Sequence, residues 1–114
     1  MHEMSLAEGI LQLVEETARR EQASHVKTIV VEIGRLSCVE PEALKFCFDS
    51  VSRGSMAEDA RLQIIDIAGS GYCSSCAANV TMLERYDACP NCGQHPLQAI
   101  TGTEMRVREI EIVS

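Results

Sequence analysis

The chain has 114 residues, 46% of them hydrophobic, and a formal net charge of -7. This length can bury one modest apolar core, and the sequence contains no apolar run of the roughly 18 residues that would indicate a membrane span. The acidic balance disfavours nucleic acid, whose phosphates bind cationic side chains, and fits cationic ligands or basic partners better.

Helices and strands follow from the apolar spacing. A capping box at Ser5 to Glu8, followed by a stripe that includes Leu13, predicts a first helix over residues 6–22, with residues 1–3 outside it. β-branched residues predict a strand over 26–36. Pro41 and Gly54 bound a second helix, and alternation predicts a second strand over 61–68.

The second half of the chain predicts an inserted lobe. Gly69-Ser70-Gly71 indicates a flexible boundary, and residues 79–84 could form one short strand. Residues 104–113 alternate as a third strand whose apolar side needs the sheet of the first two. We therefore predict an α+β fold, with two helices packed on a three-stranded sheet and an inserted four-cysteine zinc-ribbon lobe. The domains would be 1–68 plus 104–114 and 69–103.

Four of the six cysteines form two pairs, Cys73 with Cys76 and Cys89 with Cys92. Two residues between thiolates let both sulfurs face one ion, and the twelve residues between the pairs allow a hairpin that joins them. The spacing predicts a tetrahedral structural zinc site. Two disulfides and a rubredoxin-like iron site are the alternatives, and the iron site would make the protein coloured and redox-active.

Catalytic patterns are absent from the sequence. It has no Gly-rich phosphate loop, no HExxH motif and no Ser/His/Asp arrangement, so we expect a protein that is not an enzyme. It opens without the apolar core of a signal peptide, which predicts a cytoplasmic protein with reduced thiols. Cys47, on the apolar stripe of the second helix, and Cys38, in a polar loop, are expected to be structural.

Met1, His2 and Glu3 form a second candidate metal site. Initiator methionine is generally retained before a large residue such as histidine. The α-amine, the His2 amide nitrogen and the imidazole can then form fused chelate rings around one ion, and Glu3 could complete a square. Ni²⁺ and Cu²⁺ accept such a planar nitrogen set, whereas Zn²⁺ does not favour it.

The Met1-His2-Glu3 start, the segments at 34–37 and 41–44, and the late cysteine pairs resemble the HypA/HybF family of hydrogenase-maturation nickel metallochaperones over nearly the whole chain. The resemblance implies nickel as transient cargo at Met1, His2 and Glu3, and zinc at the cysteines. It also implies a partner GTPase and delivery of nickel to a [NiFe]-hydrogenase large subunit.

One departure from the family concerns histidines that follow the cysteine pairs in some members and are linked to zinc-site rearrangement and urease maturation. Here Ala77 and Gly93 occupy those places, and His95 is the only imidazole in the lobe. We therefore expect no pH-dependent ligand exchange. The rival functions are a zinc-ribbon interaction module without a second metal site and a rubredoxin-like electron carrier.

Overall fold

The computed structural model describes residues 2–114 and contains two three-stranded sheets. This part of the chain forms two compact units. The first comprises the described residues up to Val31, with Val39–Ile65 and Arg106–Ser114, and the second comprises Glu32–Cys38 and Asp66–Met105. The sequence predicted domains at 1–68 plus 104–114 and at 69–103. Two compact units do not show that these segments fold independently, so the domain division stays a prediction.

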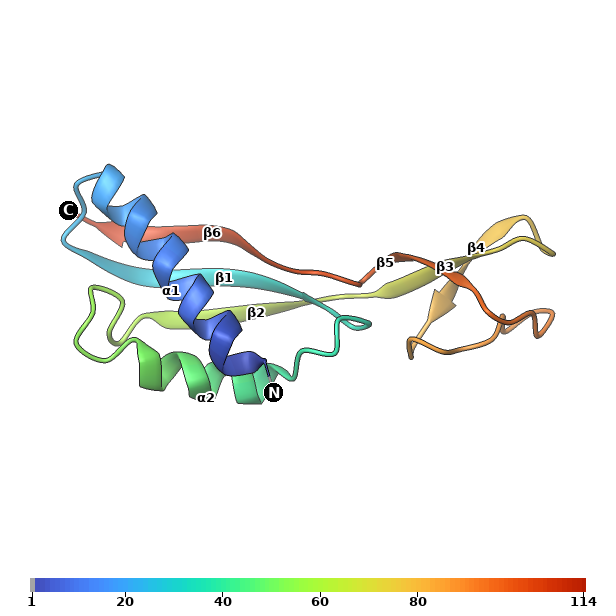
Figure 1. Cartoon of the computed structure of the whole chain (residues 1–114). Coiled ribbons are helices and arrows are strands. Elements are labelled where there is room, and N and C mark those ends of the chain that lie inside the picture. Colours follow the sequence, from blue (N-terminus) through green and yellow to red (C-terminus); the bar gives the residue numbers. More distant parts are fainter. Residues whose placement is uncertain (1) are drawn as a thin grey trace. The chain divides into compact units, whose positions relative to one another are not determined.

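The first sheet has the strand order β2-β1-β6, so the last strand of the chain joins the first two as predicted. Its strands are β1 (His25–Gly34), β2 (Arg61–Ile67) and β6 (Met105–Val113), and its helices are α1 (Glu3–Arg20) and α2 (Pro41–Val51). The two helices contact each other, and Figure 1 shows both of them alongside this sheet. The central position of β1 buries its valine and isoleucine side chains. The α+β fold class is confirmed.

α1 begins earlier than the sequence predicted. Its N-cap is His2, whose carbonyl accepts the N–H of Leu6 at 2.9 Å, and Glu3 is its first helical residue. The capping box at Ser5 is therefore wrong, and so is the placement of Glu3 outside the helix. The added turn is favoured because an acidic side chain near a helix N-terminus faces its positive dipole end. Met1 lies outside the described residues.

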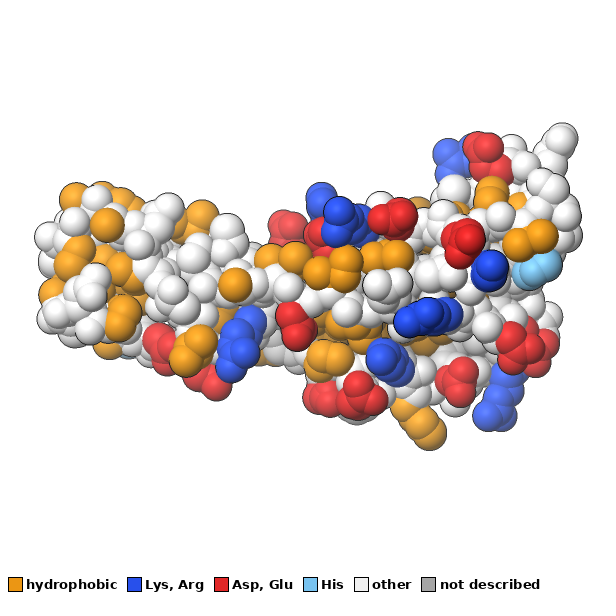
Figure 2. Space-filling model, turned by 180° about the vertical axis from the view of Figure 1, so that it is seen from behind, with side chains coloured by type: hydrophobic (Ala, Val, Ile, Leu, Met, Phe, Trp, Pro, Cys, Tyr) orange, Lys and Arg blue, Asp and Glu red, His pale blue; other side chains and the backbone are white. Residues whose placement is uncertain are grey.

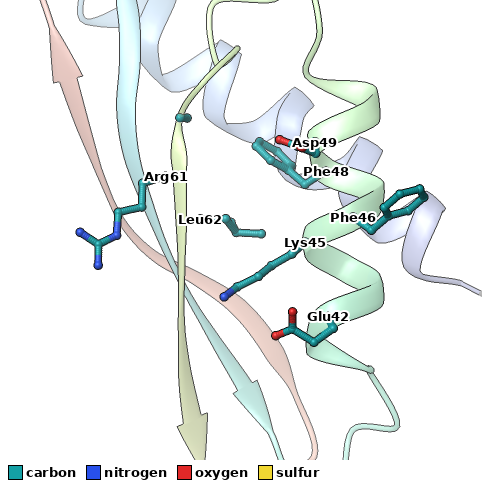
Figure 3. Close-up of a pocket in the computed structure, with 8 residues that line it drawn as sticks. Glu42, Lys45, Phe46, Phe48, Asp49, Arg61 and Leu62 are labelled. Carbon is teal, nitrogen blue, oxygen red and sulfur yellow. The ribbon is translucent and has the colours of Figure 1, made fainter.

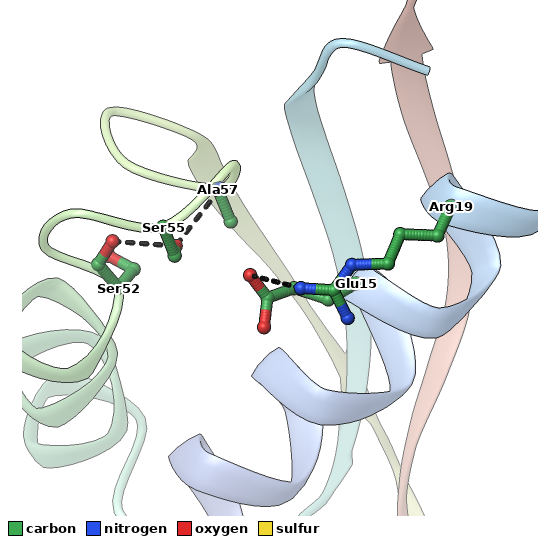
Figure 4. Close-up of polar contacts among 5 residues, drawn as sticks. All are labelled: Glu15, Arg19, Ser52, Ser55 and Ala57. Carbon is green, nitrogen blue, oxygen red and sulfur yellow. Dashed lines mark hydrogen bonds and ion pairs between the residues drawn. The ribbon is translucent and has the colours of Figure 1, made fainter. Parts of the chain in front are cut away.

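The apolar stripe of α1 also differs from the prediction. Leu13 is 47% exposed, and the buried face consists of Ala7, Ile10, Val14 and Ala18. The two small alanines allow neighbouring elements to approach the helix closely. The polar face carries an ion pair between Arg19 and Glu15 at 3.7 Å, one helical turn apart (Figure 4). Such partly exposed pairs contribute little to stability, so apolar burial orients this helix.

α2 ends where the sequence places a stop signal. A serine turn follows the helix, in which the Ser55 hydroxyl donates to the Ser52 carbonyl at 2.6 Å and accepts the N–H of Ala57 at 3.0 Å (Figure 4). Gly54 lies in the same turn with φ of 78°, a conformation that glycine adopts without steric cost. The turn satisfies the carbonyl of the C-cap residue Ser52, which the helix itself leaves unpaired.

The second sheet has the order β4-β3-β5, formed by β3 (Gly69–Cys73), β4 (Ala78–Met82) and β5 (Gln98–Thr101). The sequence predicted only one of these strands. It also predicted a flexible step at Gly69-Ser70-Gly71, which is wrong because these residues open the central strand. A Cβ on Gly69 would lie 2.6 Å from the carbonyl oxygen of Met82, and one on Gly71 would meet the Met82 sulfur. The glycines therefore permit close strand approach.

We expect Gly69→Ala to destabilise the second unit by about 1–3 kcal/mol, because the added methyl group collides with backbone that cannot rotate away. Amide hydrogen exchange over residues 69–82 should accelerate, as followed by mass spectrometry. Gly9→Ala is the matched control, since nothing lies within 4 Å of its added Cβ. Because alanine is favoured over glycine within a helix, the control should leave stability unchanged or raise it by up to about 1 kcal/mol. Equal effects of the two substitutions would contradict the steric reason.

Candidate metal centre

The second sheet and its loops bring the four paired cysteines together. Cys73 ends β3, Cys76 lies in the turn between β3 and β4, and Cys89 and Cys92 lie in the loop between β4 and β5. Their four sulfur atoms all lie within 4.8 Å of one another. Among residues 2–114, this is the only group of three or more histidine, cysteine or acidic side chains with such spacing. The four cysteines form a metal-binding cluster.

The sulfur geometry fits a tetrahedral ion. A Zn–S bond of about 2.3 Å implies sulfur atoms about 3.8 Å apart at the corners of a tetrahedron. The sulfurs of Cys73 and Cys92 are 3.5 Å apart, and those of Cys76 and Cys89 are 3.9 Å apart. All six cysteines are free, so the two disulfides weighed from the sequence do not form. The sulfur donor set suits zinc and also an iron ion.

Backbone amides support both cysteine turns. The N–H of Cys76 points at the Cys73 sulfur and that of Asn91 at the Cys89 sulfur, each at 3.4 Å. The second turn is closed by the N–H of Gly93, which donates to the carbonyl of Cys89 at 2.8 Å. Gly93 has a φ of 80°. Each turn thus directs donors at a sulfur that must carry negative charge when it binds a metal.

The thiols do not ionise equally without a cation. The backbone N–H of Cys92, followed by that of Asn91, lowers the pKa of Cys89 to about 6 despite its burial. Cys76 forms hydrogen bonds with the Cys92 sulfur and, with a smaller effect, with the Cys73 sulfur. These hydrogen bonds favour its protonated form and raise its pKa to about 12. The pKa of Cys92 is also raised. A divalent cation is therefore needed to hold all four as thiolates at neutral pH.

The start of α1 holds the other predicted ligands. His2 is exposed, and its side chain makes no capping hydrogen bond, so the imidazole is accessible. The Glu3 carboxylate instead accepts the N–H of Glu40 at 3.2 Å. That N–H donation, with a smaller one from the backbone of Glu3 itself, lowers the pKa of Glu3. Glu3 is therefore ionised at neutral pH and joins the start of α1 to that of α2.

Sequence analysis missed Glu40, which is the N-cap of α2. Its carboxylate accepts the N–H of Glu42 at 3.0 Å, while its own N–H is taken by Glu3. Two carboxylates therefore lie at the positive end of one helix dipole. An acidic residue directly before Pro41 was the available signal for a cap. The pairing with Glu3 spans 37 residues and has no local signature.

The first unit has a hollow between α2 and β2 (Figure 3). Its charged lining alternates in sign, with Lys45 and Arg61 beside two acids, and its apolar lining includes Leu62. Phe46 points away from the sheet and is 73% exposed. The hollow lacks a histidine, cysteine or serine nucleophile, and its mixed charges favour no single ligand sign.

The remaining candidates stay apart from the cluster. Cys47 is half-buried on α2, as expected of a structural residue. Cys38 is exposed with φ of 66°, a left-handed conformation uncommon for a residue with a side chain. His95 is exposed and is not part of the sulfur group.

Comparisons with known proteins agree over the full length. A family model described as hydrogenase/urease nickel incorporation metallochaperone HypA matches residues 1–112. A hydrogenase maturation factor HypA from Dechloromonas aromatica is 65% identical over 98% of this chain and 99% of that protein. Another, from Albidiferax ferrireducens, is 54% identical with the same coverage. The solution structure of the Ni metallochaperone HypA from Helicobacter pylori is 28% identical, with a TM-score of 0.71, covering 100% and 99% of the two chains.

We expect Zn²⁺ binding to the metal-free, reduced protein to release fewer than four protons per ion at pH 7. Cys89, with its pKa lowered to about 6, is already ionised there. As the pH falls through 6, Cys89 takes up a proton, so the number released should rise toward four. Calorimetry in buffers of different ionisation enthalpy measures this number. Cys38→Ser, outside the cluster, should leave it unchanged, and a release of four protons at every pH from 5 to 8 would contradict the Cys89 assignment.

Proposed function

Because the chain belongs to the HypA family of nickel-incorporation metallochaperones, we propose that it binds Ni²⁺ at Met1, His2 and Glu3 and delivers it to the large subunit of a [NiFe]-hydrogenase. As a metallochaperone of hydrogenase maturation, it is not an enzyme. The observation that carries the proposal is the exposed His2 at the N-cap of α1, in a chain similar to this family over residues 1–112.

The proposed nickel ligands are nitrogen atoms at the start of the chain. The Met1 amine, the His2 amide and the His2 imidazole can enclose one ion in fused rings, which suits the planar preference of Ni²⁺. The backbone or carboxylate of Glu3 would complete the set. Copper binds such sites more tightly than nickel, so selection of nickel depends on availability and handover.

Zinc is the proposed ion of the four-cysteine cluster. A closed cage of four thiolates suits a structural Zn²⁺, which offers no open position for substrate. Around the sulfurs, the second unit buries only Cys73, Val80 and Cys89, with Leu97 packed against them, so metal binding would add much of the stability of this end of the unit. Elemental analysis should find about one zinc and no iron per chain, and iron in place of zinc would refute the assignment.

The proposed partners are a hydrogenase-maturation GTPase and the hydrogenase large subunit, encountered in the cytoplasm. The described chain contains no helix long and apolar enough to cross a membrane. Figure 2 shows acidic and basic side chains interspersed on one face, and residues 69–103 contain only one arginine and no lysine. Since zinc-ribbon binding to nucleic acid requires cations facing phosphates, a protein partner fits this surface better.

The Glu3 carboxylate serves a positioning role in this proposal. Its hydrogen bond with Glu40 ties the first helical residue to α2, which holds the adjacent backbone nitrogens in a fixed place. When the hydrogen bond with Glu40 breaks, the same carboxylate can turn toward a basic residue of a partner. Nickel held by a few ligands at a chain end can leave by stepwise ligand exchange, whereas a closed thiolate cage cannot release its ion in this way.

We expect His2→Gln to abolish stoichiometric nickel binding and to leave the zinc content unchanged. The fold should persist because His2 supports α1 only through its backbone carbonyl. One residue added before Met1 should weaken nickel binding comparably, since the amine then leaves the chelate ring. His95→Gln is the control. Isothermal titration with Ni²⁺ measures the effect, and unchanged affinity in the His2 variant would refute the assignment.

We expect Glu3→Gln to impair hydrogenase maturation or partner association more than it impairs nickel affinity. A glutamine oxygen still accepts the Glu40 N–H, so the tie between the helices persists while the charge is lost. Glu3→Ala removes the tie as well and should weaken both properties. Hydrogenase activity in nickel-poor medium and nickel titration provide the two readouts. Normal maturation by the Glu3→Gln protein would leave Met1 and His2 as the whole functional site.

A further inference from the structure

Gln94 contacts both cysteine turns of the cluster. Its side-chain oxygen accepts the N–H of Ser75 at 2.9 Å and the Ser74 hydroxyl at 3.2 Å, and it also accepts the Ser75 hydroxyl. Its amide nitrogen donates to the Ser74 hydroxyl oxygen at 2.9 Å. Ser74 and Ser75 are the two residues between Cys73 and Cys76. The carboxamide therefore holds the first turn by both of its ends.

The backbone of the same residue closes the second turn. The carbonyl of Gln94 accepts the N–H of Cys89 at 2.9 Å, next to the hydrogen bond between Gly93 and Cys89. Gln94 follows Cys92 by two positions, so its backbone cannot move independently of that ligand. One residue thus joins the Ser74-Ser75 backbone to the turn that carries Cys89 and Cys92.

The orientation of the carboxamide is fixed by its partners. The Ser75 N–H can only donate, so the atom facing it must be the amide oxygen. The Cys73 sulfur lies 3.6 Å from that oxygen, so Gln94 borders the cluster. Groups that hold metal ligands from outside the coordination shell commonly change metal retention by about 10- to 100-fold when removed.

We propose that Gln94 is a positioning residue that locks the two cysteine turns together and thereby slows loss of the metal. A thiolate leaves its ion when its turn swings away and the sulfur takes up a proton. With the carboxamide in place, neither turn can swing without breaking the hydrogen bonds to Ser74 and Ser75. This inference rests on the proposed zinc site and does not depend on nickel binding.

The test compares zinc transfer from the loaded full-length protein to excess chromophoric chelator. We expect Gln94→Ala to transfer zinc about 10- to 100-fold faster than the original protein. Gln94→Asn, which keeps the amide but is one methylene shorter, should be nearly as fast because it does not reach the serines. Gln98→Ala is the matched control. Gln98 is exposed on β5, and within residues 2–114 its side chain makes no hydrogen bond that links the turns.

A second readout separates positioning from general support of the lobe. In the Co²⁺-substituted protein, the Gln94→Ala variant should keep the absorption of a four-thiolate tetrahedral site but with shifted bands, since the turns relax relative to each other. Equal zinc transfer by Gln94→Ala and Gln98→Ala would overturn the proposal, as would a loss of thermal stability without faster transfer. Failure of the original protein to take up zinc would instead refute the zinc site itself, and the inference with it.

Discussion

The cysteine end of the second unit depends on the convergence of four sulfurs, because few apolar side chains are buried around them. The buried cluster around the sulfurs consists of Cys73, Val80 and Cys89, with Leu97 against it, so two of its three members are candidate metal ligands. Ile33, Leu36 and Met82 are buried in the same unit but outside this cluster. A fully buried aliphatic side chain contributes about 1.5–3 kcal/mol, whereas a structural zinc ion contributes about 10–16 kcal/mol in apparent terms. At this end of the unit a bound zinc ion would therefore outweigh the buried side chains, in contrast to the first unit, where Ile29, Val14 and Phe48 are buried.

The two candidate metal sites differ in how their ligands are held. The cysteines lie on turns fixed by strand pairing and by backbone hydrogen bonds, so each sulfur is kept near its neighbours before an ion arrives. The proposed nickel ligands lie at the end of a helix, where only the Glu3 carboxylate and the His2 carbonyl are engaged. An ordered cage favours retention and an exposed chain end favours exchange. This contrast matches a structural ion on one unit and transient cargo on the other.

The sequence predicted those features whose cause is local. Cysteine spacing identified the cluster, and apolar periodicity identified both helices and the three strands of the first sheet. Prediction from the sequence failed where the cause lay far away along the chain. α1 extends to Glu3 because a partner for that carboxylate lies at Glu40, and the glycine step at Gly69 is a strand because Met82 approaches it closely. Glycines that permit packing and glycines that permit flexibility have the same local signature.

The charge distribution of the lobe leaves its four cysteine sulfurs without a cationic side-chain cluster. Residues 69–103 contain only three charged side chains, Glu84, Arg85 and Asp87, so no cationic cluster offsets four thiolates. Neutral donors support the sulfurs instead, and they are too few: backbone N–H groups lower the pKa of Cys89, whereas the pKa values of Cys76 and Cys92 are raised. Ala77 and Gly93, directly after the pairs, bring no donor side chain. A bound cation would then be the main counter-charge, so its occupancy of the cluster would stabilise all four sulfurs as thiolates.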